Sequence, residues 1–393
     1  MYVTEAEYRA QLEAAIAQQV FPTVTTTTAD GSTSTEDLIQ GDTVYVAPQM
    51  DGQTLVTLVR LNVTDGDEGV DASTSVLGLR GTVYASQDNI YFAGQSWQRP
   101  TLDWAGAART DIVKFSLGET IEPEGVGHVP GWIRNSFSLD EHEGHLRVST
   151  SDSVDELANN VFVLEDTGDD LDVVGEVTGL APGQRIFATR FVGERGYVVT
   201  FRQFDPLHVI DLSDPTAPFE AGFLEVPGVS TYLHPVGDTH LLGFGRDATN
   251  DGRLQGLKLS LYDVSDPTNP TEVDTLLFDE AGAYNYSEAE WNHLAFSFFA
   301  SRNTAAMPIG GGAWGDLSFG LAVVDVDTAT GLESIGEVKH QAPVRRSLRI
   351  DDFIYSVGTD AVKLVPIDEP DNVLAAVELE GFTSIWPGPI VLF

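Results

Sequence analysis

Two ten-residue segments with closely similar sequences limit how this chain can fold. VIDLSDPTAP ends at Pro218 and LYDVSDPTNP ends at Pro270, and both run from a strand of apolar residues into the same turn. In that turn Pro215 and Pro267 fix φ, and the aspartates before them can accept hydrogen bonds from the backbone that follows. A strand and a turn written twice predict a repeated unit of structure.

Five further strands of the same kind align with these two, so seven occurrences follow one another at intervals of about fifty residues. A hairpin signal typically precedes the recurring element and a short apolar strand follows it, which makes it the third of four antiparallel strands. Its central residues are Arg60, Lys114, Val163, Asp211, Asp263, Asp325 and Pro366. Seven such units predict an all-β, seven-bladed β-propeller. Six or eight blades are the alternatives, because the interval between the fifth and sixth occurrences is long.

The two ends of the repeat region predict how the ring closes. The first unit has only DTVYVA, residues 42–47, before its third strand, whereas SIWPGPIVLF, residues 384–393, is a spare strand. Pairing these segments would complete the first blade and remove an open sheet edge. We therefore assign residues 42–393 to the propeller. Residues 1–41 contain a predicted short helix with a capping-box pattern at Thr4 and Glu7, then a Thr/Ser-rich linker or exposed arm.

Several stretches resemble a known family. RIFATRFVGERGYVVTFRQFDPLHVIDLSDPTAP, VSTYLHPVGDTHLLGFGRD, GLKLSLYDVSDP and NSFSLDEHEGHLRVSTSD are similar to secreted bacterial and archaeal proteins with a C-terminal β-propeller domain distantly related to WD40 repeats. The resemblance is most specific over residues 137–299. It implies a propeller and export to the periplasm, the cell surface or the medium, often with a lipid anchor, by a signal that this sequence does not contain. It implies no established reaction, so no catalytic residue is carried over.

The charge of the chain narrows the classes of partner. There are 60 acidic and 21 basic residues, a formal net charge of -39 at pH 7. Such a surface repels nucleic acid and anionic lipid headgroups, and it suits a salty habitat, cations or cationic partners. The absence of cysteine excludes disulfides and thiol catalysis. No apolar run approaches the roughly 20 residues of a membrane-spanning helix.

Arginine is scarce but recurs just before the predicted hairpins, where the innermost strand of each blade begins. The candidates are Arg80, Arg134, Arg185, Arg345 and Arg346. Guanidinium groups converging on a central channel would bind carboxylate or phosphate ligands. The alternative is that each arginine ties adjacent blades together through acidic or carbonyl partners.

Two acidic turns are candidate Ca²⁺ sites. DATNDG places Asp247, Thr249 and Asp251 at alternate positions before a glycine, but Lys258 stands where an EF-hand needs its bidentate glutamate. A second oxygen-rich loop contains Asp65, Asp67 and Asp71. Because Ca²⁺ takes six to eight hard oxygens, either loop furnishes about half of a site. The alternative is a pair of solvated turns.

A hairpin rich in histidine and carboxylate is a weaker candidate for a transition metal. It contains Asp140, Glu141, His142, Glu143 and His145, and its alternative is an exposed turn. Five tryptophans could either stack on sugars or wedge between blades: Trp97, Trp104, Trp132, Trp291 and Trp314. The motifs of serine hydrolases, zinc proteases and nucleotide-binding proteins are absent from the sequence.

These features favour a binding or scaffolding module at the cell envelope over an enzyme. We expect a monomer that presents loops on one face to a protein or a polysaccharide. The alternatives are a hydrolase or lyase that acts on an anionic substrate in the channel, and a structural protein stabilised by Ca²⁺.

Overall fold

The computed structural model describes residues 23–379, with gaps at 29, 40–43, 47–53, 62–69, 79–80, 98–107, 119, 153–156, 202–204, 250–251, 279–284 and 314–315. Within these residues the regular elements are β-strands and 3₁₀-helices of three residues each. The expected all-β class is confirmed. The predicted N-terminal helix and the predicted closing segment, 384–393, lie outside the described residues.

The chain divides into two compact units. The N-terminal unit consists of Met1–Val148, Asp152–Val154 and Val163–Val174, and the C-terminal unit consists of Ser149–Ser151, Asp155–Phe162 and Gly175–Phe393.

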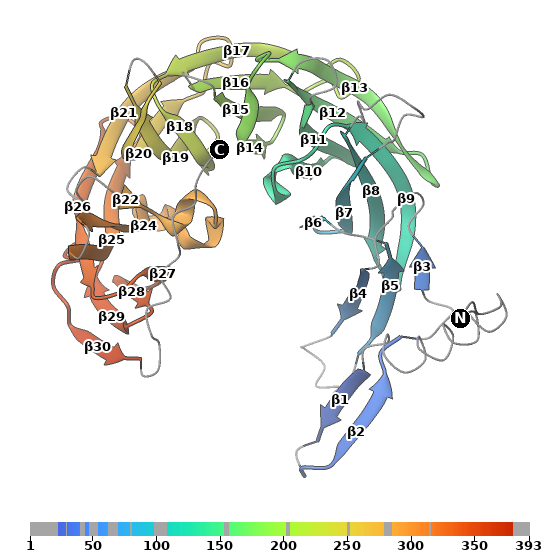
Figure 1. Cartoon of the computed structure of the whole chain (residues 1–393), viewed down its shortest axis with the longest axis horizontal. Helices are drawn as coiled ribbons and strands as arrows, with labels where there is room; N and C mark the ends of the chain where they lie inside the picture. Colours follow the sequence, from blue (N-terminus) through green and yellow to red (C-terminus); the bar gives the residue numbers. More distant parts are fainter. Residues whose placement is uncertain are drawn as a thin grey trace, which may run out of the picture. The chain divides into compact units, whose positions relative to one another are not determined.

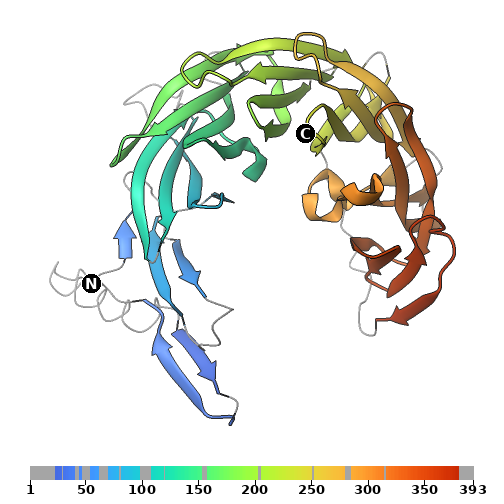
Figure 2. The same cartoon turned by 180° about the vertical axis from the view of Figure 1, so that it is seen from behind.

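The C-terminal unit contains four successive antiparallel sheets (Figures 1 and 2). Their strands are, sheet by sheet, β14 (Arg185–Val192), β15 (Arg195–Phe201), β16 (Asp205–Asp211) and β17 (Phe219–Val226); β18 (Val229–Val236), β19 (His240–Ala248), β20 (Leu254–Asp263) and β21 (Thr271–Phe278); β22 (Asn285–Tyr286), β23 (Ser297–Phe299), β24 (Thr304–Ala313), β25 (Asp316–Asp327) and β26 (Gly331–His340); and β27 (Val344–Ile350), β28 (Phe353–Gly358), β29 (Ala361–Pro366) and β30 (Ala375–Glu378). Each sheet runs in chain order, with β23 as an extra partner of β24. These sheets are four-stranded blades, as predicted.

Two further groups of four strands form one eight-stranded sheet in the order β10-β11-β12-β13-β9-β8-β7-β6. The strands are β6 (Thr82–Ala85), β7 (Asn89–Trp97), β8 (Ala108–Leu117), β9 (Ile121–Pro130), β10 (Leu139–His142), β11 (His145–Asp152), β12 (Ala158–Asp166) and β13 (Asp170–Leu180). The fourth strands of the two groups, β13 and β9, pair in parallel at Leu171 and Gly127. Six of the seven recurring elements therefore occupy the third strand of a four-stranded group.

The first recurring element departs from this pattern. We expected the strand around Arg60 to lie between its neighbours in sequence. In the sheet formed by β3 (Val44–Val46), β4 (Leu55–Arg60) and β5 (Ala72–Leu77), β5 lies in the middle and β4 is at the edge. The middle strand is also the most buried, since Ser75 and Val76 are 0% and 1% exposed. The seven-blade count and the closure of the ring remain predictions.

Part of the predicted linker or arm is an exposed hairpin of β1 (Thr23–Thr27) and β2 (Thr33–Asp37). Threonine favours extended backbone because its β-branched side chain fits a pleated surface. The Thr25 and Thr35 hydroxyls are hydrogen-bonded across the two strands at 3.0 Å. The hairpin therefore forms from cross-strand pairs without an apolar face.

The repeated phrase folds into two turns with the same hydrogen bonds. Oδ1 of Asp214 accepts from the backbone N–H and the hydroxyl of Thr216 at 2.9 and 2.7 Å. Oδ1 of Asp266 accepts from the same two groups of Thr268 at 3.0 and 2.7 Å. Each turn joins the third strand of its blade to the fourth, as predicted from the sequence.

These turns pack on a glycine in the fourth strand of the preceding blade. A Cβ at Gly175 in β13 would overlap the carbonyl oxygen of Pro215, and one at Gly222 in β17 would lie 2.7 Å from the carbonyl oxygen of Pro267. Gly336 in β26 meets the Pro370 ring of the last turn in the same way. The repeat thus encodes both a turn and a contact between neighbouring blades.

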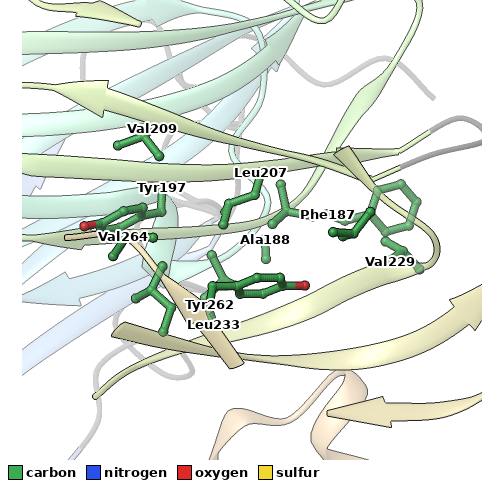
Figure 3. Close-up of a cluster of buried hydrophobic side chains, with 12 residues drawn as sticks. Phe187, Ala188, Tyr197, Leu207, Val209, Val229, Leu233, Tyr262 and Val264 are labelled. Atoms are coloured by element: carbon green, nitrogen blue, oxygen red, sulfur yellow. The ribbon is translucent and has the colours of Figure 1, made fainter. Parts of the chain in front are cut away.

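Apolar side chains fill the space between adjacent blades. One buried cluster joins β14, β15 and β16 to the next sheet (Figure 3). Leu207 of β16 and Leu233 of β18 are each 1% exposed in this cluster, and Tyr197 and Tyr262 face it with their rings. Burial of this kind contributes about 25 cal/mol for each Å² of apolar surface removed from water.

The contact between turn and glycine predicts a stability difference between two alanine substitutions. Gly175→Ala would force the Pro215 turn to move and should lower the free energy of unfolding by about 1–3 kcal/mol. Gly118→Ala is the control, because its Cβ would lie 3.5 Å from the nearest atom, and it should change stability by less than about 0.5 kcal/mol. Urea unfolding followed by circular dichroism measures both. Equal effects would contradict the contact.

Candidate functional site

The long interval between the fifth and sixth repeats contains an insertion of three 3₁₀-helices. Residues 287–302, called the insertion below, hold η4 (Glu288–Glu290), η5 (His293–Ala295), β23 and η6 (Ala300–Arg302) between β22 and β24. A capping box starts it: Oγ of Ser287 accepts from the Ala289 N–H at 3.1 Å, and the Glu290 carboxylate accepts from the Ser287 N–H at 3.1 Å. In Figure 1 the insertion lies beyond β22 and β24, on the side opposite the outer strand β26.

Arginines from the two flanking sheets hold the insertion in place. Arg246 of β19 binds both oxygens of Glu290, with Nε–Oε1 and Nη2–Oε2 distances of 2.6 and 2.9 Å. Arg345 and Arg346 of β27 bind the two oxygens of Glu288 at 2.6 and 3.1 Å. The Glu288 residue is 8% exposed. Paired, buried carboxylates of this kind fix geometry, because leaving either one unpaired would be costly.

The anchored insertion presents two large apolar side chains to water. Trp291 is 49% exposed and Leu294 is 59% exposed. Trp291 and Arg345 line a cavity of about 10 Å³, which holds one water molecule at most. Among the described residues, the cavity beside Trp291 is therefore too small to enclose a substrate.

Cationic side chains lie beside this surface. Arg190 of β14 donates to the Leu233 carbonyl and to the Tyr232 hydroxyl, both at 3.2 Å. Burial lowers the pKa of His293, and the charges of Arg190 and Arg346 lower it further. The charges of two arginines from different sheets therefore both disfavour the protonated form of His293.

An aromatic group surrounds the second histidine of this region. Tyr232 is hydrogen-bonded through its hydroxyl to Nδ1 of His234 at 3.0 Å, and the rings of Phe296 and Phe298 lie 5.7 and 5.3 Å from the His234 ring. Burial, followed by the charge of Arg190, lowers the pKa of His234 to about 4.

The structure brings together two of the five arginines proposed from the sequence. Arg345 and Arg346 both pair with Glu288. Part of their role is therefore to connect adjacent blades through an acidic partner, which is the alternative to ligand binding given above. Arg185 begins β14 and lies 4.9 Å from the centre of the Phe187 ring. Arg134 belongs to the N-terminal unit, where its backbone N–H donates to Ser138 Oγ at 3.1 Å. Arg80 lies outside the described residues.

The predicted Ca²⁺ loops are only partly described. Asp65, Asp67 and Asp251 lie outside the described residues. Thr249 closes the hairpin between β19 and β20, with its N–H donating to the Arg253 carbonyl at 2.9 Å, while Asp247 lies at the end of β19. Asp71 lies 4.0 Å from the Arg60 guanidinium. Among the described residues, no three histidine or acidic side chains are grouped as metal ligands, so Ca²⁺ binding remains a prediction.

The histidine-rich hairpin joins β10 to β11, and its carboxylates bind other side chains. Asp140 pairs with Arg147, and Glu141 accepts from Nδ2 of Asn89 at 2.8 Å. Nδ1 of His145 lies 3.2 Å from the Glu143 carbonyl. These contacts support the alternative of a structural turn.

A serine, a histidine and an aspartate are hydrogen-bonded in the order used by hydrolases. Nε2 of His340 lies 2.9 Å from Ser356 Oγ, and its Nδ1 lies 2.8 Å from Asp360 Oδ1. Ser356 and the His340 side chain are both 0% exposed, however, so no substrate reaches the hydroxyl. Burial lowers the pKa of His340 although Asp360 acts in the opposite direction. The network ties the end of β26 to β28 and the turn after it.

The larger described hollow, about 670 Å³, is in the N-terminal unit beside β4. It is open and lined by Leu58, Val59, Arg60, Leu61, Ile90, Leu117, Gly118 and Ile121. Among its described lining residues Arg60 is the one that is charged, and these residues offer no pair of groups for acid–base chemistry.

The lowered pKa of His234 predicts a pH dependence of stability. The unfolded chain binds the histidine proton near pH 6.5, whereas the folded chain binds it near pH 4. Stability from the neutral ring is therefore complete above pH 6.5 and is lost as the pH falls towards 4, by an amount on the order of 2 kcal/mol.

The variant His234→Phe should show a smaller loss of melting temperature between pH 6.5 and pH 4 than the wild type. His145→Phe, at the exposed turn between β10 and β11, is the control and should behave as wild type. The same pH slope in His234→Phe and the wild type would show that His234 is not buried in its neutral form.

Two curated proteins are similar to this chain in sequence. The chain is 38% identical over 256 residues to an uncharacterised protein of Archaeoglobus fulgidus, a match that covers 65% of this chain and 37% of that protein. It is 33% identical over 284 residues to an uncharacterised protein of Methanocaldococcus jannaschii, covering 71% of this chain and 42% of that protein. The match thus spans about two fifths of the length of these curated relatives.

Solved structures match this chain at much lower sequence identity. The periplasmic gluconolactonase PpgL of Pseudomonas aeruginosa is 13% identical with a TM-score of 0.46, and covers 83% of this chain and 97% of that one. Sqt1 of Saccharomyces cerevisiae is 9% identical with a TM-score of 0.43, and the match covers 75% of this chain and 84% of Sqt1. The family model described as a β-propeller domain matches residues 1–369. With its repeated four-stranded sheets and this match over most of its length, the chain belongs to the β-propeller domain family.

Proposed function

We propose that this protein is a non-enzymatic, exported binding module at the cell envelope, and that the insertion is its recognition surface. The observation that carries the proposal is the exposure of Trp291 and Leu294 on a segment that two buried carboxylates, paired with arginines, hold in place. Export is inferred from the family resemblance of the sequence. The expected partner is a protein segment with an apolar side chain.

The energetics of the insertion support recognition. The side chains of Glu288 and Glu290 are largely withdrawn from water, and their pairing with arginines offsets the cost of desolvating the two carboxylates. This anchoring keeps two apolar side chains in contact with water. Tryptophan and arginine are the residues most enriched among those that dominate protein interfaces. A segment held rigid before binding also loses less conformational entropy on association.

The described cavities favour binding over the hydrolase or lyase alternative. Small-molecule sites usually occupy about 300–1,000 Å³ and bury most of the ligand. The cavity beside Trp291 is far smaller. The hollow beside β4 has a volume within this range, but it is open, and Arg60 is the one charged residue among its described lining. The one serine-histidine-aspartate network that we identify in the described residues is closed to solvent.

Peptide binding tests the proposed surface. Peptides selected from a displayed random library on the full chain should bind at least tenfold more weakly to Trp291→Ala, and also to Leu294→Ala, because truncating a central interface residue costs about 2 kcal/mol or more. Phe219→Ala is the matched control, since Phe219 is 54% exposed on the outer strand β17.

Two results would contradict this assignment. Selected peptides whose affinity depends on Phe219 and not on Trp291 would place recognition elsewhere. The second result would be that no peptide is selected, that polygalacturonate binds tightly, and that Trp291→Ala abolishes this binding. The partner would then be a polysaccharide and not a protein.

Thermal unfolding separates the Ca²⁺ alternative from a solvated acidic coat. With a net charge of -39, self-repulsion destabilises the compact state and added salt screens it. We therefore expect NaCl to raise the melting temperature, and millimolar Ca²⁺ at matched ionic strength to add nothing relative to EDTA. A rise specific to Ca²⁺ that is lost in Asp247→Asn would instead support a metal site in the β19–β20 turn.

A further inference from the structure

We infer that the two partly exposed arginines of β27, Arg345 and Arg346, form a subsite for a carboxylate group of the partner. The element η5, which carries His293, packs against β27, and Arg190 of β14 adds a further positive charge to the region. This inference rests on the proposed function, because it assigns an acidic group to the ligand of the same surface. The elements that carry these residues, β14, η5 and β27, all belong to the C-terminal unit.

The arginine pair keeps donors available after it has bound Glu288. Each guanidinium has five N–H groups. Within the described residues, the contacts of Arg345 use one of its N–H groups, which binds Glu288, and those of Arg346 use Nη1, which also donates to the Arg345 carbonyl at 2.6 Å. Their side chains are 38% and 37% exposed. One carboxylate therefore pairs with two cations, and both guanidinium side chains remain more than one third exposed.

His293 places an imidazole in the field of this cluster. The positive charges of Arg190 and Arg346 both lower the pKa of His293 and so favour its neutral form. An anion that binds between these groups would reverse that influence and favour the protonated ring. His293 therefore reports on the charge of whatever occupies the subsite.

The ligand chemistry follows from the surroundings. Guanidinium groups bind both carboxylate and phosphate in a forked geometry. A doubly charged phosphate is repelled more strongly than a carboxylate by a chain with a net charge of -39. Trp291 and Leu294 lie two residues and one residue from His293 in sequence and offer apolar contact beside it. A carboxylate next to an apolar side chain, as in an acidic peptide, satisfies both features.

Histidine NMR of the full chain tests the subsite with a defined probe. Protein labelled with ¹⁵N-histidine is titrated with N-acetyl-leucinate and with neutral N-acetyl-leucinamide at constant ionic strength. We expect the carboxylate to raise the measured pKa of His293 by about one pH unit and the amide to leave it unchanged. Arg346→Gln should abolish the rise.

Arg349→Gln is the matched control. Arg349 lies on the same strand, β27, donates through Nε to the Asp351 carbonyl at 2.6 Å, and donates through Nη1 to the Ser301 hydroxyl of the insertion. It does not pair with Glu288, so its loss removes a contact with the insertion but should leave the rise intact. Equal responses to acid and amide, or a full rise in Arg346→Gln, would overturn the subsite. A larger rise with inorganic phosphate than with the carboxylate would overturn the choice of ligand.

The proposed function and this inference can fail separately. If the selected peptides lose affinity in Trp291→Ala but bind equally well after every Glu and Asp is replaced by Gln and Asn, the recognition surface stands and the carboxylate subsite is wrong. If N-acetyl-leucinate raises the pKa of His293 while Trp291→Ala leaves peptide binding unchanged, the subsite stands and the assigned surface is wrong.

Discussion

The contact of a turn with a glycine in the preceding blade is the constraint on which the C-terminal unit depends. The turn must bring its prolines against the neighbouring fourth strand, and only a residue without a Cβ leaves room, as at Gly175 and Gly222. Once this spacing is set, the apolar faces of two sheets meet at a distance that Leu207 and Leu233 fill. The backbone hydrogen bonds of Asp214 and Asp266 hold the turns in the shape that makes the contact.

One pair of blades reverses this arrangement and shows which feature matters. At the junction of β25 and β26 the glycine is Gly331, the first residue of β26, directly after the turn and with φ of 113°. There the β21 residue is Asp274, whose carboxylate accepts from the Leu332 N–H at 2.8 Å. The turn still approaches the fourth strand of the preceding blade closely. Here, however, the glycine that permits the approach belongs to the later blade and not to the preceding one. Spacing between blades, and not the sequence of the turn alone, is therefore what the repeat maintains.

The sequence predicted the periodic parts of the molecule because they repeat. Strand composition and the two identical turns located the third strand in six of the seven units. Where local pattern was weak the prediction failed, as around Arg60, since the pairing partner of a short apolar strand is decided by tertiary contact. Likewise, single residues such as Arg190 and His234 carry no pattern of their own. The insertion did leave two signals, the long fifth interval and the S-x-x-E capping box at Ser287, although its arginine partners come from distant strands.

The acidic coat has a consequence for how separate copies of this protein meet. In the described part of the C-terminal unit, each sheet ends on a strand with one unpaired edge, and these strands carry acidic residues such as Glu220, Glu272 and Glu333. Unpaired edges invite strand addition from a second molecule. Two such edges approach with like charges, and the repulsion acts over about 10 Å in dilute salt but only about 3 Å in molar salt. Colloidal stability therefore becomes a function of the medium: salt that strengthens each molecule also weakens the barrier that keeps the molecules apart.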